Sequence, residues 1–303
     1  MNITLKQLDC IAKDPALHLA FTDLVYFAGR LWLAYRSASS HHRQDGVIIV
    51  MVQTQDGWCE NAVIRAAGDL RDPKFSVSVG GALLLNCARV EGKQLYSVLY
   101  QFEQNHWQQV ALLAEPDQWL WRLQGCTERS YGFAYQHPNT LKFYQIQQDF
   151  SSQLLLDNPL NENQIVDGYP NETGLCLSPQ QRMYCLLRRD GKDPRAMLGQ
   201  SEPPYLHWQW QILDTRIGGP VLTYYRPDQP LLAVVRLFEP FRTSICRIDI
   251  ERGEIIEVLA LPSAGDTSYA GLAWLDGSQL RVSYYSSHEG PSAIYLAQLV
   301  VSQ

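Results

Sequence analysis

The sequence is short of charge, and it contains no basic cluster. Charged residues make up only 18% of its 303 residues, and the formal net charge is −6. An acidic chain of this kind has no electrostatic field that would gather nucleic acid or an anionic membrane surface. We therefore expect neither of these partners, and an acidic ligand would need a local group of arginines.

Cysteine and histidine occur without the spacings that hold metals or disulfide frameworks. The seven cysteines form an odd set with no CxxC, and the seven histidines show no HxH or HExxH. The phosphate-binding patterns GxGxxG and GxxxxGK[ST] are also missing. The sequence predicts buried free thiols, no metal and no cofactor.

Long apolar runs are absent as well. No stretch approaches the ~18 residues of a membrane span, and the N-terminus has no basic segment followed by an apolar core. These features, with the lack of a disulfide pattern, favour a reduced, soluble, cytoplasmic protein.

What the sequence does have is a repeated strand pattern. Short runs of Val, Ile, Leu, Tyr and Trp alternate with Gly, Asp, Asn and Pro turns, and amphipathic helix patterns are nearly absent. A unit of about 45 residues restarts near Lys74, Tyr131, Thr173, Pro220 and Gly271. The sequence predicts an all-β fold, one domain over residues 1–303 that forms a six-bladed β-propeller, with five blades as the alternative.

The two ends of the chain complete this prediction. A lone four-stranded sheet has two exposed edges, and a radial arrangement of sheets protects them. The last unit, Ala270–Val301, reads as three strands, and Ile3–Ile11 could supply a fourth. We expect the N- and C-terminal strands to share one blade and close the ring.

Polar residues within the inner strands are the candidates for a ligand site, because the innermost strand of each blade lines the central channel. In chain order they are Asp23, Arg36, Asp45, Arg71, Asp72, Arg122, Glu172, Arg188, Arg236, Arg242, Tyr269, Tyr284 and Tyr285.

Three parts of the sequence carry a family resemblance. The segment Gly29–Arg36 is followed by Asp45 and by the turn Thr54–Trp58. This order is similar to that of the sialidase superfamily, in which a second strand ends in Arg, a loop carries an acid Asp, and a turn forms an Asp-box.

The other two parts lie further along the chain. Asn171–Ser178 and Met183–Arg188 resemble the sialidase segment in which a Glu opens one strand and an Arg ends the next. Ser268–Leu272 and Val282–Ser287 resemble the last-blade segment in which sialidases place their catalytic Tyr.

The resemblance implies a glycoside hydrolase that cleaves a terminal sugar of a carbohydrate or glycoconjugate. It implies Tyr269 as nucleophile, Glu172 as the base that activates it, and Asp45 as general acid. A neutral Tyr suits a sugar whose anomeric carboxylate would repel an anionic nucleophile.

The planar guanidinium of an arginine would bind such a carboxylate through two parallel hydrogen bonds. The resemblance implies this role for Arg188 together with Arg242 or Arg236. Further substrate-binding candidates at blade positions of the same kind are Arg36, Arg71 and Tyr285. Each could instead be a rim ion pair or a core aromatic.

One departure opens a second interpretation. Where sialidases begin their first blade with Arg-Ile-Pro, this chain has Phe21–Leu24, with an acid at Asp23. Asp23, the Asp72 of an Arg-Asp-Pro motif and Glu172 resemble the three carboxylates of five-bladed furanosidases. There Asp23 would be nucleophile or base, Asp72 would steady the transition state, and Glu172 would be the acid. A non-catalytic sugar-binding or scaffold propeller is the alternative from another class.

Overall fold

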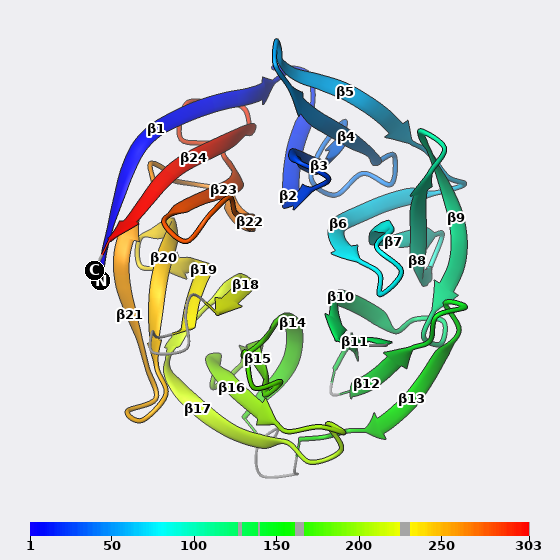
Figure 1. Ribbon diagram of the computed structural model, residues 1–303, viewed down its shortest axis with the longest axis vertical. Coiled ribbons are helices and arrows are strands. Elements are labelled where there is room, and N and C mark those ends of the chain that lie inside the picture. Colours follow the sequence, from blue (N-terminus) through cyan, green and yellow to red (C-terminus); the bar gives the residue numbers. More distant parts are fainter. Residues whose placement is uncertain (127–128, 139, 161–166, 225–230, 303) are drawn as a thin grey trace.

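The chain is a ring of six four-stranded antiparallel sheets around a central channel (Figure 1). The computed structural model describes residues 1–126, 129–138, 140–160, 167–224 and 231–302. The prediction of a six-bladed β-propeller is confirmed, and the five-bladed alternative is wrong. In the described part of the chain no helix is long and apolar enough to cross a membrane.

The first three blades follow one another along the chain, each beginning with its innermost strand. The first comprises β2 (His18–Phe27), β3 (Arg30–Ala38), β4 (Val47–Thr54) and β5 (Gly57–Ile64). The second comprises β6 (Asp69–Val77), β7 (Leu83–Glu91), β8 (Gln94–Glu103) and β9 (His106–Leu113). The third comprises β10 (Trp119–Cys126), β11 (Arg129–Gln136), β12 (Thr140–Ile146) and β13 (Ser152–Asp157).

The next two blades repeat this order, and the last one combines both ends of the chain. The fourth comprises β14 (Gly168–Leu177), β15 (Met183–Gly191), β16 (Arg195–Ser201) and β17 (Gln209–Arg216). The fifth comprises β18 (Gly218–Tyr224), β19 (Leu231–Phe238), β20 (Phe241–Asp249) and β21 (Glu254–Ala260). The sixth comprises β22 (Thr267–Trp274), β23 (Gln279–Ser286), β24 (Ala293–Ser302) and β1 (Asn2–Lys13).

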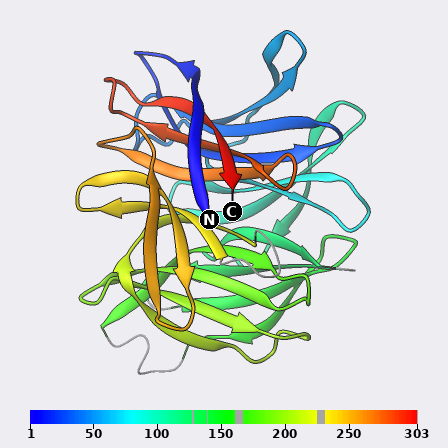
Figure 2. The same cartoon turned by 60° about the vertical axis from the view of Figure 1, so that its left-hand side comes forward.

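The ring closes through main-chain hydrogen bonds between its two ends. β1 pairs with β24 in antiparallel register from Asn2 opposite Ser302 to Lys13 opposite Ala293. The two termini lie beside each other (Figure 2). The predicted closure is therefore confirmed, and it covers a sheet edge that would otherwise be open.

Apolar side chains fill the space between adjacent blades. Between the first two blades, Trp32 and Ile48 from one sheet are buried in the same cluster as Phe75, Leu85 and Val98 from the next. Burying one such side chain contributes about 1.5–3 kcal/mol. The prediction of buried thiols is confirmed for Cys87, Cys176, Cys185 and Cys246, whereas Cys10 and Cys59 are exposed.

Each innermost strand contains a bulge, and each bulge lies near the start of its strand. They fall between Ala20 and Asp23, Arg71 and Lys74, Leu120 and Arg122, Pro170 and Thr173, Gly218 and Val221, and Ser268 and Gly271. A bulge re-aims the side chains of the strand that carries it. Phe21, Asp72, Gly219 and Tyr269 sit there with positive φ values of 57°, 50°, 55° and 47°. The bulges thus gather side chains of different blades at one mouth of the channel.

Arg36 is a cross-brace between the first two blades, which corrects the expectation that it binds substrate. Its side chain is 0% exposed and forms an ion pair with Asp69, whose Oδ1 lies 2.8 Å from Arg36 Nη2. The carbonyls of Leu70 and Arg43 accept further hydrogen bonds from the same guanidinium. No part of it is left to contact a ligand.

Replacing Asp69 by Asn is expected to destabilise the fold by about 3–5 kcal/mol, because it leaves the buried Arg36 without its counter-charge. Urea unfolding would measure this. Glu202→Gln is the matched control, since Glu202 pairs with Arg182 on the surface, with side chains 55% and 47% exposed, and such pairs contribute about 1 kcal/mol or less. Equal losses in the two variants would contradict a structural role for the Arg36 pair.

Candidate active site

Glu172, Arg188 and Tyr269 meet at the bulge-bearing mouth of the channel. The Tyr269 hydroxyl donates to Glu172 Oε1 at 2.7 Å, and Arg188 Nη1 donates to the same oxygen at 2.7 Å. Arg188 Nη1 also lies 3.0 Å from the Tyr269 hydroxyl. The backbone N–H of Gly219 donates to Glu172 Oε2 at 2.8 Å. The sequence-based expectation that Glu172 and Arg188 share one location is met, although they lie on different strands.

Burial decides the protonation state of the tyrosine. Glu172 and Tyr269 are 4% and 8% exposed. Desolvation raises the pKa of Tyr269 well above 10, and the negative charge of Glu172 adds to it, while Arg188 and Arg236 oppose the shift. Tyr269 is therefore a neutral phenol at physiological pH. Its hydroxyl donates a hydrogen bond to Glu172, a base to which it could release its proton.

Arg236 and Tyr285 also lie beside Tyr269. The Arg236 guanidinium is 5.1 Å from the centre of the Tyr269 ring. Its Nη2 donates to the Tyr285 hydroxyl at 3.0 Å and to Asp266 Oδ1 at 3.2 Å. The Tyr285 hydroxyl donates to the same Asp266 oxygen at 2.6 Å. The structure thus brings the predicted Arg236 and Tyr285 to the mouth, and it adds Asp266, which sequence reasoning missed.

Two histidines complete the Asp266 cluster. His18 Nε2 lies 3.0 Å from Asp266 Oδ2, and His41 Nδ1 lies 2.9 Å from the same oxygen. Burial works to raise the pKa of Asp266, but the hydrogen bonds of His18, His41 and Tyr285 lower it well below its usual range. His41 lies in the loop between β3 and β4. Its partners lie far away in the chain, so no local spacing could reveal the group.

Asp72 is a buried carboxyl within electrostatic range of Glu172. It is 5% exposed, and its Oδ1 has no hydrogen-bond partner in the protein. Burial raises its pKa from 3.8 to about 6; Lys74 lowers it, and Glu172 raises it further. Lys74 is itself 2% exposed, with its ammonium 5.2 Å from the centre of the Trp121 ring. Asp72 can therefore carry a proton at slightly acidic pH and has an oxygen free to use it.

Asp23 lies deeper in the channel and is fully engaged. It is 1% exposed, and Arg122 binds both of its oxygens at 2.7 and 3.1 Å. The backbone N–H of Phe75 also donates to it at 2.6 Å. This corrects the interpretation of Asp23 as nucleophile or base, since an oxygen held by a guanidinium and an amide is a poor attacker. Its role is to tie three blades together at the channel.

Three further predicted residues do not join the site. Asp45 is exposed, and its hydrogen bond with Ser39 lowers its pKa; it is therefore deprotonated at neutral pH and unsuited to be the general acid. Arg242 forms a bidentate pair with Glu257 at 2.8 Å. Arg71 pairs with the buried Asp69, yet it lies close enough to Asp72 to lower the pKa of that carboxyl.

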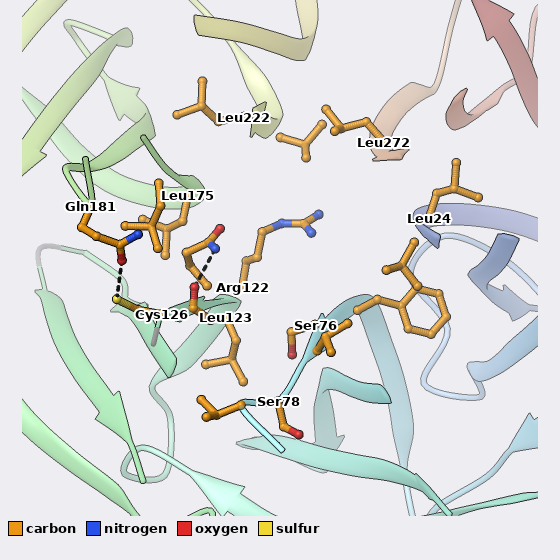
Figure 3. Close-up of a pocket in the computed structure, with 18 residues that line it drawn as sticks. Leu24, Ser76, Ser78, Arg122, Leu123, Cys126, Leu175, Gln181, Leu222 and Leu272 are labelled. Atoms are coloured by element: carbon orange, nitrogen blue, oxygen red, sulfur yellow. Dashed lines mark hydrogen bonds between the residues drawn. The ribbon is translucent and has the colours of Figure 1, made fainter. Parts of the chain in front are cut away.

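A cavity of about 520 Å³ lies at the opposite end of the channel. Its walls come from the parts of the inner strands that follow the bulges, and the side chain of Arg122 lies in its middle (Figure 3). Leucines from four blades are part of the apolar wall: Leu24, Leu175, Leu222 and Leu272. Glu172 and Tyr269 are not among its lining residues. The pair therefore belongs to the other mouth.

Comparison with known proteins leaves the family open and supports the fold. No known family profile and no curated protein matches the sequence. A solved protein of unknown function from Dyadobacter fermentans superposes with a TM-score of 0.83 at 15% identity, covering 99% of this chain and 100% of that one. An α-L-arabinanase from Penicillium chrysogenum, complexed with arabinobiose, gives 0.76 at 13%, with 97% and 98% covered. Trypanosoma rangeli sialidase gives 0.62 at 10%, with 93% of this chain and 55% of that one covered.

The chain has the sialidase-like propeller fold. At these identities the likeness concerns the fold alone, so the chemistry of this propeller has to be argued from its own residues. At the mouth of this propeller the phenol of Tyr269 is hydrogen-bonded to the carboxylate of Glu172. The same mouth holds the carboxyl of Asp72, whose pKa is raised, and the two arginines beside the phenol, Arg188 and Arg236.

Proposed function

We propose that this propeller is a glycoside hydrolase that cleaves a terminal sugar at the mouth where Glu172, Arg188 and Tyr269 meet. The observation that carries the proposal is the 2.7 Å hydrogen bond from the Tyr269 hydroxyl to Glu172 Oε1, made inside the site and bridged by Arg188. A weak nucleophile needs an adjacent base within hydrogen-bond reach, and this pair has that geometry.

The proposed reaction runs in two steps. The Tyr269 oxygen attacks the anomeric carbon while its proton passes to Glu172, and the glycosidic bond breaks as Asp72 gives its proton to the leaving oxygen. Water then attacks the anomeric carbon, and the bond from that carbon to the Tyr269 oxygen breaks. Asp72 accepts a proton from this water, and Glu172 returns its proton to the phenol. Two displacements at one carbon retain the anomeric configuration. In this scheme Asp72 takes the acid role that the sequence assigned to Asp45.

The charge balance favours a neutral sugar over a sialic acid. Arg188 forms ion pairs with both Glu172 and Asp190, and Arg236 pairs with Asp266. The stretch that matches the Arg-Ile-Pro of sialidases contains no arginine, and the ring of its Phe21 packs edge-on against Tyr269 at 5.0 Å between centroids. The carboxylate of a sialic acid would therefore have to displace the protein carboxylates that already pair with Arg188 and Arg236.

The solved neighbours support the hydrolase class. The Penicillium arabinanase and the Fusarium graminearum arabinofuranosidase are both complexes with arabinobiose, a neutral sugar. A terminal pentofuranose or another neutral sugar is therefore the first substrate to test.

A screen of 4-methylumbelliferyl glycosides, including α-L-arabinofuranosides and sialosides, tests the proposal. We expect turnover of a neutral glycoside that is lost in Glu172→Gln and kept in Glu257→Gln. Glu257 is the matched control because it also pairs with an arginine, Arg242, but lies outside the site. Binding of sugars without any turnover would contradict the proposal and favour a carbohydrate-binding propeller.

Gly219→Ala is expected to lower turnover as well as stability. Gly219 has a φ of 55°, and a Cβ there would lie 3.0 Å from Cγ and 3.1 Å from Cα of Tyr269. The added methyl would push the phenol away from Glu172. A residue other than glycine that is held at such a positive φ costs about 1–3 kcal/mol of folding stability.

Gly29→Ala is the control for Gly219→Ala. Gly29 has a φ of 76° but nothing within 4 Å of the added Cβ, so this variant carries the backbone cost without the steric one. Thermal unfolding and kcat of both variants separate the two effects. Equal kcat values would contradict the proposed dependence on the position of Tyr269.

A further inference from the structure

His18, His41 and Asp266 form a compact group of three metal-ligand types. His18 comes from the start of β2, His41 from the loop between β3 and β4, and Asp266 directly precedes β22. Their donor atoms lie within 4.8 Å of one another. Both imidazole nitrogens approach one oxygen, Asp266 Oδ2, at 3.0 and 2.9 Å. Three separate segments thus present two nitrogens and one oxygen to one point.

The two nitrogen–oxygen separations are close to those of ligands that share a cation. Two donor atoms held about 2.1 Å from a metal lie ~3.0 Å apart at a right angle and ~3.4 Å apart at a tetrahedral angle. Two histidines and one carboxylate are a donor set that suits Zn²⁺ and its first-row neighbours, and water would complete the shell. The side chains of His41 and Asp266 are 38% and 32% exposed, which gives an ion access from solvent.

The other oxygen of Asp266 is fixed by an outer group of hydrogen bonds. The Tyr285 hydroxyl donates to Oδ1 at 2.6 Å, and Arg236 Nη2 donates to it at 3.2 Å. Such outer partners orient a ligating carboxylate and leave one oxygen for the metal. The positive charge of Arg236 weakens cation binding, so a modest affinity is expected. Phe21 and the His42 ring flank His41, with centroids 5.3 and 4.6 Å from its ring.

We propose that His18, His41 and Asp266 bind a divalent transition-metal ion such as Zn²⁺. The sequence predicted no metal, because its ligands come from three segments and share no local spacing. The site would tie the β3–β4 loop to the first and last blades beside the mouth of the channel. This inference is independent of the proposed hydrolysis, since binding is measured without a substrate.

Calorimetric titration of the chelator-treated, dialysed chain with ZnCl₂ at neutral pH tests the proposal, and the absorption spectrum of bound Co²⁺ reports its ligands. We expect one saturable ion per chain. His18→Ala and His41→Ala should each abolish this binding. Tyr285→Phe keeps all three ligands but removes a hydrogen bond from Asp266, and it should weaken binding by about 10–100-fold.

The histidine next in sequence supplies the control. His42→Ala should leave the affinity and the cobalt spectrum unchanged, because His42 is not one of the three ligands. Because its side chain is part-exposed, His41→Ala should keep the fold even if His18→Ala does not, and thermal unfolding checks this. Failure to bind Zn²⁺ would overturn the proposal. Binding that survives His41→Ala would come from other groups, such as the exposed thiols of Cys10 and Cys59, and would overturn it equally.

Discussion

Glu172→Gln is expected to lower kcat by about 10²–10⁴-fold on any glycoside that the wild type cleaves. The substitution keeps the shape of the side chain, and its one amide oxygen can still accept either the hydrogen bond of Gly219 or that of Tyr269. It removes the base that takes the phenolic proton. The pKa of Tyr269 is raised by its burial, so without that base the tyrosine stays protonated and does not attack. Steady-state kinetics on the best substrate of the screen would measure the loss.

Tyr269→Phe and the double variant distinguish a working pair from two independent residues. Groups that act as one unit give strongly non-additive losses. The double variant should therefore be about as slow as the slower single variant. Losses that multiply would contradict the proposed transfer of a proton from Tyr269 to Glu172. Thermal unfolding of each variant checks that the Arg188 side chain, which keeps its ion pair with Asp190, still supports the fold.

Turnover is expected to fall as the pH rises through about 6, because Asp72 must be protonated to act as the acid and its pKa is raised to about 6. Burial is the main cause of the shift, and Glu172 adds to it, while Lys74, Arg71 and Arg36 oppose it. Asp72→Asn should remove this fall of turnover with rising pH. Its loss of kcat should be larger for a disaccharide, whose leaving group needs the proton, than for an activated aryl glycoside.

The same carboxyl makes a separate prediction for stability. With a pKa of 3.8 when unfolded and about 6 when folded, the native state holds the proton more tightly. Between about pH 4 and pH 6 the unfolded chain loses that proton first, so the contribution of Asp72 to stability falls as the pH rises. Relative to the wild type, Asp72→Asn should gain about 2 kcal/mol from pH 4 to pH 7. A stability difference that is the same at both pH values would contradict a buried, proton-holding Asp72.

The fold could be predicted because its information is local and repeated. Each blade restates the same pattern of strands and turns, so an error in one unit is corrected by the others. The closure of the ring also followed from the sequence, because the last unit lacked one strand and Ile3–Ile11 read as the missing one. β1 lies beside β24 as this argument requires.

The site could be predicted where its members stand on the first two strands of a blade. Glu172 and Arg188 lie on consecutive strands, so their spacing was readable. Arg36 shows the limit of that reasoning: it also ends the second strand of a blade, yet its guanidinium turns into the contact between blades to meet Asp69. The histidine group was missed because His18 and Asp266 are 248 positions apart in the chain. Closure of the ring brings these residues of the first and last blades together, and the repeat pattern of the sequence does not show which residues then meet.

The central claim is that Tyr269 attacks the sugar with Glu172 as its base. Incubation with a 2-deoxy-2-fluoro glycosyl fluoride of the sugar that the wild type cleaves would slow the second step, and mass spectrometry of the digested protein would locate the label. We expect a fluoroglycosyl group on the peptide that contains Tyr269, and none in Tyr269→Phe. A label on Glu172 or Asp72, or steady turnover with no labelled peptide at all, would contradict it.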